Sequence, residues 1–76
     1  MNRQYVSSSD IASIGYENGT LEIEFHSGGI YQYLNVPEKV YHNLMNSTSY
    51  GKYFYNYIKN SYFPIKISWY YKRRTS

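Results

Sequence analysis

The first half of the chain alternates apolar and polar residues with the period of a β-strand. After the Asn18-Gly19 pair, one face carries Leu21, Ile23 and Phe25, and the other carries Glu22, Glu24 and His26. This alternation predicts a strand with one buried face and one solvated face. Asn-Gly is the strongest short hairpin signal, because a type I′ turn needs positive φ at both central residues. With a second turn at Ser27-Gly28-Gly29, residues 12–34 are predicted to form a three-stranded antiparallel meander.

The spacing of apolar residues becomes helical after residue 35. Pro37 suits the first turn of a helix, and it precedes an apolar stripe of Val40, Tyr41, Leu44 and Met45. Ser49 is the predicted N-cap of a second helix. The core-facing stripe of that helix follows the i, i+3, i+4, i+7, i+8 pattern and comprises Tyr50, Tyr53, Phe54, Tyr57 and Ile58. Tyr55, between Lys52 and Lys59 on the other side, is predicted to be exposed.

A final strand is predicted after Pro64, which cannot continue the second helix. Its alternating faces are Ile65, Ile67, Trp69 and Tyr71 on one side and the basic, solvated set Lys66, Ser68, Tyr70 and Lys72 on the other. The predicted fold class is α+β: an antiparallel three-stranded meander followed by two helices on one face and a C-terminal strand. Residues 1–9 are expected to be a flexible N-terminal arm, residues 10–71 a single domain and residues 72–76 a basic tail.

The chain length limits how much core this domain can build. A chain of 76 residues buries only about 60% of the surface that its unfolded form exposes. It has no cysteine, which excludes disulfides and Cys-based zinc sites. Oligomerisation is the remaining common aid to stability, so a homo-oligomer such as a homodimer is expected. The absence of a secretory signal and of a run of roughly 20 apolar residues indicates a cytoplasmic protein without a membrane partner.

The net charge of +3 conceals an asymmetry between the two halves. Residues 1–38 carry five acidic residues against Arg3 alone, a net charge of −4, whereas residues 39–76 carry seven basic residues and no acid, a net charge of +7. Such a split indicates one basic face that attracts phosphate or an acidic protein. It is equally consistent with a dipolar surface that aids solubility or head-to-tail contacts between copies.

Two segments combine residues that bind phosphates and bases. Ser49-x-Gly51 followed by Lys52 would form an anion site at a helix start, although an N-cap and a closely packed glycine also explain it. The aromatic and basic residues at the C-terminus are typical of surfaces that stack single-stranded nucleic acid, although a core tryptophan and a solubilising tail explain them too. The candidate ligand-binding residues are Ser49, Gly51, Lys52, Tyr55, Lys59, Lys66, Trp69, Tyr70, Lys72, Arg73 and Arg74.

No residue set in the sequence favours catalysis. His26 and His42 are the two histidines, and neither has a partner at metal-ligand spacing. Glu22 and Glu24 share a strand face about 7 Å apart, but a solvated strand face explains them more simply than acid–base chemistry. We therefore expect a protein that is not an enzyme and holds no cofactor or metal.

The order and spacing of short motifs over residues 7–62 resembles the KTSC domain. This short domain occurs at the C-terminus of some lysyl-tRNA synthetases and as small free-standing bacterial and phage proteins. The matching elements are Ser8, Ile11, Ile14-Gly15-Tyr16, Leu21-x-Ile23-x-Phe25, Gly28, Tyr31-x-Tyr33, Val36-Pro37, Tyr41, Leu44, Ser49-x-Gly51, Tyr53-Phe54, Ile58 and Tyr62. The chain departs from the family at Ser47, where alanine is usual, at Tyr55, where asparagine is common, and at Lys59, where arginine is common. The synthetase context implies RNA as a ligand.

Three functions are compatible with these features. The first is a small non-catalytic module that binds RNA or another phosphate-bearing ligand, and this hypothesis predicts strongly salt-dependent binding. The second is a phage or bacterial protein that sequesters a nucleotide signal in a tyrosine-lined pocket between subunits. The third is a protein-interaction module, such as an inhibitor of a host enzyme, in which tyrosines anchor the interface.

Overall fold

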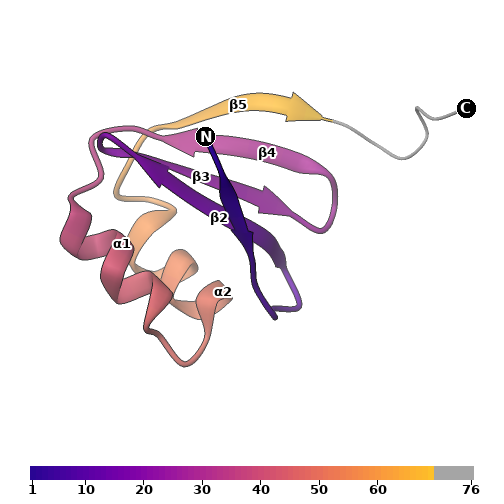
Figure 1. Cartoon of the computed structure of the whole chain (residues 1–76), viewed down its shortest axis with the longest axis horizontal. Coiled ribbons are helices and arrows are strands. Elements are labelled where there is room, and N and C mark those ends of the chain that lie inside the picture. Colours follow the sequence, from indigo (N-terminus) through magenta and orange to yellow (C-terminus); the bar gives the residue numbers. More distant parts are fainter. Residues whose placement is uncertain (70–76) are drawn as a thin grey trace, which may run out of the picture.

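The protein, described here by a computed structural model of residues 1–69, is built on one five-stranded antiparallel sheet (Figure 1). Its elements are β1 (Arg3–Tyr5), β2 (Ile11–Glu17), β3 (Thr20–Phe25), β4 (Gly29–Tyr33), α1 (Glu38–Met45), α2 (Tyr50–Tyr53), the π-helical turn η1 (Phe54–Ile58) and β5 (Pro64–Trp69). The strands lie in the sheet in chain order, each antiparallel to the next. The α+β class with two helices is confirmed. The predicted three-stranded meander is matched only in part, because β2, β3 and β4 lie within a five-stranded sheet. The predicted strand count is wrong, because the segment expected to be a flexible arm carries β1.

The Asn18-Gly19 turn joins β2 to β3 as predicted and also anchors the first helix. Asn18 has φ 48° and Gly19 has φ 84°, the positive values that a type I′ turn requires. The carbonyl of Gly19 accepts a hydrogen bond from the N–H of Val36 at 2.8 Å. The hydroxyl of Tyr16 donates to the carbonyl of Val36 at 2.6 Å. The hairpin therefore holds the chain directly before α1.

The core lies between the sheet and the helices. Its buried residues are Ile11, Ile14, Leu21, Ile23, Tyr33, Val36, Leu44, Phe54 and Ile58. The ring of Phe54 meets the rings of Phe25 and Tyr33 edge to face, with both centroid distances at 5.5 Å. Leu44 of α1 and Ile58 of η1 are fully buried. Both helical segments therefore pack on the same face of the sheet, as the sequence predicted.

The second helix begins as predicted but changes its period after one turn. Ser49 is the N-cap, and its Oγ accepts a hydrogen bond from the N–H of Lys52 at 3.2 Å. In η1 the N–H of Lys59 donates to the carbonyl of Phe54 at 2.9 Å, an i to i+5 bond. This wider turn shifts the stripe out of phase, so Tyr57 is 59% exposed, contrary to the prediction that it is buried. Tyr55 is 62% exposed, which confirms its prediction.

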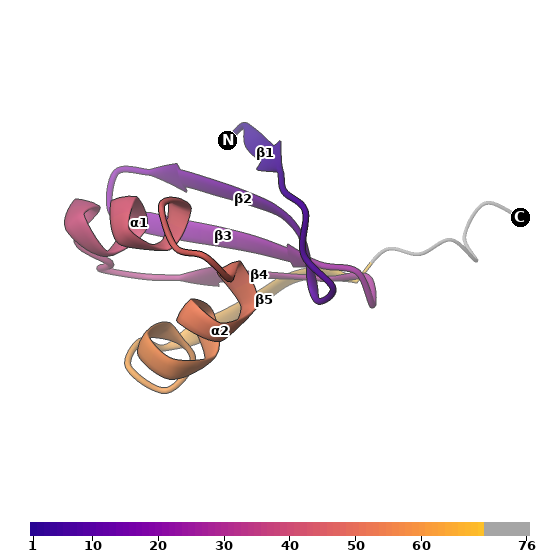
Figure 2. The same ribbon diagram turned by 90° about the horizontal axis from the view of Figure 1, so that it is seen from below.

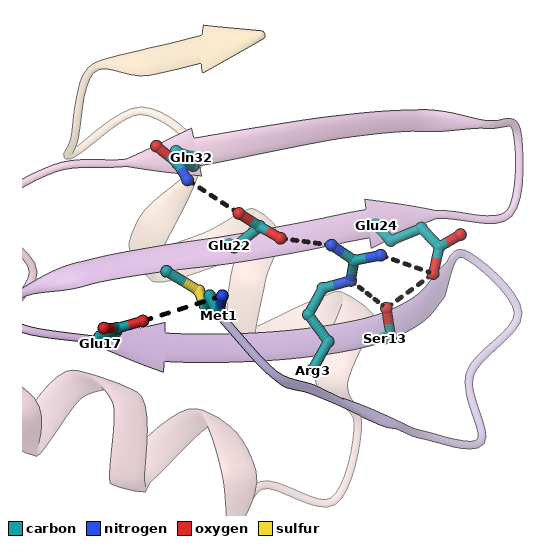
Figure 3. Close-up of polar contacts among 7 residues, drawn as sticks. All are labelled: Met1, Arg3, Ser13, Glu17, Glu22, Glu24 and Gln32. Atoms are coloured by element: carbon teal, nitrogen blue, oxygen red, sulfur yellow. Dashed lines mark hydrogen bonds and ion pairs between the residues drawn. The ribbon is translucent and has the colours of Figure 1, made fainter. Parts of the chain in front are cut away.

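The sheet face that carries the acidic residues of β3 is buried, so the predicted solvated face is wrong. Glu22 and Glu24 are each only 7% exposed. The guanidinium of Arg3, delivered by β1, donates to Glu22 and lies 3.8 Å from Glu24 (Figure 3). The hydroxyl of Ser13 donates to Glu24 at 2.7 Å, and the amide of Gln32 donates to Glu22 at 2.8 Å. The N-terminal strand thus closes this face with a hydrogen-bonded cluster.

Gly15 makes room for the segment that closes this face. A Cβ placed on Gly15 would lie 2.8 Å from the backbone oxygen of Asn2 and 2.9 Å from Cγ of Arg3. Both distances are shorter than an ordinary van der Waals contact. The absence of a side chain at Gly15 therefore allows the N-terminal segment to approach the sheet closely enough for Arg3 to reach the acids.

The last described strand, β5, is an edge of the sheet and pairs only with β4. Ile65 is 37% exposed and Ile67 is 47% exposed, so the apolar alternation of this strand does not mark a buried face. An edge strand has one neighbour and shares less of the core than a central strand. Tyr70 and the predicted basic tail, residues 72–76, lie outside the described residues.

We expect Arg3→Met to lower the free energy of unfolding by about 2 kcal/mol, because Glu22 and Glu24 would remain buried without their counter-charge. Methionine retains an apolar side chain of similar length, so the loss of packing is small. Urea denaturation measures the difference. Adding Glu22→Gln to Arg3→Met should restore part of the stability, since one uncompensated charge is removed. An equal loss in Lys39→Met, which changes an exposed lysine of α1, would contradict this interpretation.

Candidate ligand-binding cleft

A cleft of about 1130 Å³ lies between the second helix, the sheet and the loop before β2. Figure 2 shows α2 far from β1, the edge strand that carries Arg3. The cleft and the Arg3 cluster occupy different faces of the sheet, because side chains alternate along β3: Phe25 lines the cleft, whereas Glu22 and Glu24 pair with Arg3. The lining of the cleft comprises Ser7, Ser8, Ser9, Asp10, Ile11, Phe25, Ser27, Tyr31, Tyr33, Thr48, Ser49, Tyr50, Gly51, Lys52, Phe54, Tyr55, Asn56, Lys59, Asn60, Tyr62 and Pro64. The lining therefore combines aromatic rings, small hydroxyl groups, amides and a few charges.

The sheet contributes an aromatic wall to the cleft. Phe25 and Tyr31, on adjacent strands, pack edge to face with their ring centroids 5.9 Å apart. Tyr33 is 4% exposed, and burial, followed by the effect of the neighbouring Tyr31, raises the pKa of Tyr33 to about 12. The phenol of Tyr33 is therefore neutral at physiological pH and presents an uncharged ring to the core.

The second helix contributes the cationic wall. Lys52 lies in α2 and Lys59 follows η1, and both are exposed side chains of the lining. The Nζ of Lys59 lies 4.7 Å from the ring centroid of Tyr55, which is cation–π geometry. This wall therefore presents an ammonium group and an aromatic ring held together at the edge of the cleft.

The loop of residues 7–10 forms the third wall and is tied to the end of β3. The Oγ of Ser8 accepts hydrogen bonds from the N–H groups of Asp10 at 3.3 Å and of Ile11 at 3.2 Å. The N–H of His26 donates to the carbonyl of Asp10 at 3.0 Å. The Nε2 of His26 lies 2.9 Å from the carbonyl oxygen of Ser8. Across the cleft, a Cβ placed on Gly51 would lie 3.4 Å from Oδ2 of Asp10, so the loop and the helix start are neighbours.

The structure brings five of the predicted binding residues into one lining: Ser49, Gly51, Lys52, Tyr55 and Lys59. Lys66 belongs to β5 and is not part of this lining. Trp69 is the last residue of β5. Tyr70, Lys72, Arg73 and Arg74 lie outside the described residues, and the ligand-binding role of all eleven stays a prediction.

Sequence reasoning missed the wall formed by Ser8 and Asp10, which had been assigned to the arm and to the start of the domain. A serine whose hydroxyl accepts hydrogen bonds from the N–H groups two and three residues later is a recognisable local signal for a turn. Nothing in the neighbouring sequence indicates that this turn faces the second helix. Asn56 and Asn60 were also missed. Their place in the lining depends on the π-helical turn, which has no sequence pattern of its own.

The described residues contain no group of three or more His, Asp and Glu side chains that could hold a metal ion. His42 lies 3.6 Å from Glu38 on α1, and both side chains are mostly exposed. Within residues 1–69, no helix is long and apolar enough to cross a membrane.

The fold and the cleft define a small α+β domain in which a meander carries two helices and a mixed aromatic and cationic hollow. The KTSC domain family matches residues 7–62, and the chain belongs to this family. A solved KTSC domain protein from Yersinia pestis is 48% identical, with a TM-score of 0.85 over 88% of this chain and 97% of that one.

Two further relatives contain segments that are similar to this chain. An uncharacterised protein of Stutzerimonas stutzeri is 37% identical over 83% of this chain and 92% of its own length. A lysine–tRNA ligase of a Nostoc species is 46% identical over 57% of this chain, but the match spans only 8% of the ligase. Similar segments therefore occur both in a protein of comparable length and as a small part of a long enzyme.

We expect the stability of the protein to fall as the pH rises from about 10 to about 12, because Tyr33 ionises in the unfolded chain before it ionises in the folded one. Its pKa is raised in the folded state, so its contribution is fully present below the unfolded value of about 10. The urea midpoint as a function of pH measures this fall. Tyr33→Phe should flatten it, whereas Tyr55→Phe, at an exposed position, should not. Identical profiles for Tyr33→Phe and the unchanged protein would exclude this assignment.

Proposed function

We propose that this KTSC domain is a non-catalytic module that binds RNA, or another phosphate-bearing ligand of the same chemistry, in the cleft beside the second helix. The observation that carries the proposal is the pairing of Lys59 with the ring of Tyr55, at 4.7 Å, on the edge of a cleft of about 1130 Å³. Proteins that bind single-stranded nucleic acid combine cations for the backbone with aromatic rings for the bases. Both components occur here on adjacent turns of one helix.

The charges of the lining favour a phosphate at the lysine wall. Lys52 and Lys59 are exposed and belong to the lining, so their ammonium groups can reach a ligand. The start of α2 is less suitable for a phosphate, because the carboxylate of Asp10 already lies beside Gly51. A phosphate beside the lysines leaves a base free to stack on an exposed ring such as Tyr55.

The relatives support a binding role without adding a catalytic one. The segment similar to this chain occupies only a small part of lysine–tRNA ligases, proteins named for a reaction with a tRNA. A short module with tyrosines and lysines in a cleft suits an accessory contact with RNA. The described residues offer no arrangement of histidines and carboxylates in the cleft that resembles a catalytic set.

We expect Lys59→Ala to weaken binding of single-stranded RNA about tenfold, the effect of one charge-assisted hydrogen bond to a phosphate. The slope of log K against log salt should fall by about 0.7, since one phosphate contact is lost. Fluorescence anisotropy with a labelled oligonucleotide of about ten residues measures both values. Lys52→Ala should behave similarly. Lys39→Ala removes the same charge from α1, outside the cleft, and is the matched control.

Equal affinities and slopes for all three lysine variants would exclude the cleft as the RNA site. If a mononucleotide binds as tightly as the oligonucleotide, the ligand is a free nucleotide instead of a strand. If the folded protein binds neither the oligonucleotide nor the mononucleotide, the result would favour the protein-interaction function.

We expect Tyr55→Leu to weaken RNA binding by ~1–3 kcal/mol, because a base stacked on the ring would lose its partner. Tyr57→Leu is a closely matched control: Tyr57 is 59% exposed, against 62% for Tyr55, and belongs to the same helical segment but not to the lining of the cleft. The same anisotropy titration compares them. A similar loss in both variants would indicate a general effect of exposed tyrosines and not a stacking site.

A further inference from the structure

The cleft contains a carboxylate that the fold leaves unpaired. Asp10 is the one acidic side chain among the described residues of the lining. The other four acids are engaged elsewhere: Glu22 and Glu24 with Arg3, Glu17 with the N-terminal ammonium at 4.0 Å, and Glu38 with His42 at 3.6 Å. No side chain of residues 1–69 forms a hydrogen bond or ion pair with the carboxylate of Asp10.

The backbone of Asp10 is held in place on both sides. Its N–H donates to Ser8 Oγ at 3.3 Å, and its carbonyl accepts from the N–H of His26 at 3.0 Å. These bonds use the main chain of Asp10 and leave both carboxylate oxygens available. Because the turn is fixed, a ligand group that binds the carboxylate does not have to order the loop first.

The carboxylate also lies beside the start of α2, the helix that carries Lys52. Its Oδ2 would lie 3.4 Å from a Cβ at Gly51, the residue before Lys52. The carboxylate therefore lies against the start of α2, at ordinary contact distance from a Cβ at this position. The cleft therefore presents two different chemistries: an acceptor beside the helix start, and two ammonium groups along the helix.

An ionised carboxylate has two acceptor oxygens and no donor. Among the four RNA bases, guanine alone offers two adjacent donors, N1–H and N2–H, on its Watson–Crick edge, and these match a carboxylate in a bidentate contact. Uracil places carbonyl groups on both sides of its N3–H and is repelled. Cytosine and adenine each offer one amino group. In single-stranded RNA this edge is free to be read.

We propose that Asp10 makes the cleft select guanine, by accepting from its N1–H and N2–H groups while Lys52 and Lys59 hold the adjoining phosphate. This selectivity rests on the proposed function, because it requires a nucleotide in the cleft. The chemistry is the same for a guanosine within a strand and for a free guanine nucleotide.

The test compares labelled oligouridines of about ten residues that differ at one central position: guanosine, inosine or uridine. Inosine lacks the N2 amino group, so this comparison removes one donor from the ligand without any substitution in the protein. The guanosine oligonucleotide should bind about tenfold more tightly than the uridine one, within the range of a bidentate base contact. The inosine oligonucleotide should lie between them. Competition with unlabelled guanosine and uridine monophosphates then distinguishes a strand from a free nucleotide as the source of the guanine.

The variant Asp10→Asn should abolish the preference for guanosine over uridine and leave the salt slope unchanged, because its amide offers only one acceptor atom. Glu38→Gln removes the same charge from α1, outside the cleft, and should retain the preference. Thermal unfolding of each variant checks that the fold is intact.

Salt-dependent binding without base preference in the unchanged protein would overturn the role of Asp10 and leave the proposed function standing. A preference for guanosine that persists in Asp10→Asn would also overturn the role of Asp10 and leave the proposed function standing. The carboxylate would then have a structural role beside α2. Absence of binding to every oligonucleotide and mononucleotide would overturn both proposals.

Discussion

The packing of Phe54 against the sheet positions the helical wall of the cleft. Its ring meets Phe25 and Tyr33 edge to face at equal centroid distances, a geometry that contributes about 0.5–1.5 kcal/mol per pair beyond area burial. Phe54 is also the first residue of the π-helical turn. The same side chain therefore fixes the second helix on the sheet and begins the wide turn that presents Tyr55 and Lys59.

The sheet keeps two of the acids of the first half away from the cationic wall of the cleft. On the face opposite the second helix, Arg3 compensates Glu22 and Glu24, and the hydroxyl of Ser13 completes the cluster. Because these two acids are paired on that face, they do not neutralise Lys52 and Lys59 in the cleft. Asp10 differs from these two acids, because its carboxylate lies in the lining of the cleft and has no partner among the side chains of residues 1–69.

The tyrosines serve several purposes, as their amphipathic chemistry allows. Tyr16 donates to the carbonyl of Val36 and stacks on Tyr41, with the ring centroids 4.7 Å apart. Tyr33 is buried in the core, whereas Tyr55 is exposed beneath the ammonium of Lys59. A small chain can thus use one residue type both to build its core and to present rings to a ligand.

The sequence by itself determined the features that depend on neighbouring residues: the Asn18-Gly19 hairpin, the cap at Ser49, the three central strands and both helices. Short-range geometry decides these, since a turn or a cap is complete within a few residues. The tertiary structure alone decided that Glu22 and Glu24 are buried, because Arg3 reaches them from a strand 19 residues away from Glu22 in sequence. It also decided that Tyr57 is exposed and that Asp10 meets Gly51. These outcomes depend on contacts between distant segments, and the alternation of apolar and polar residues carries no information about what will cover each face.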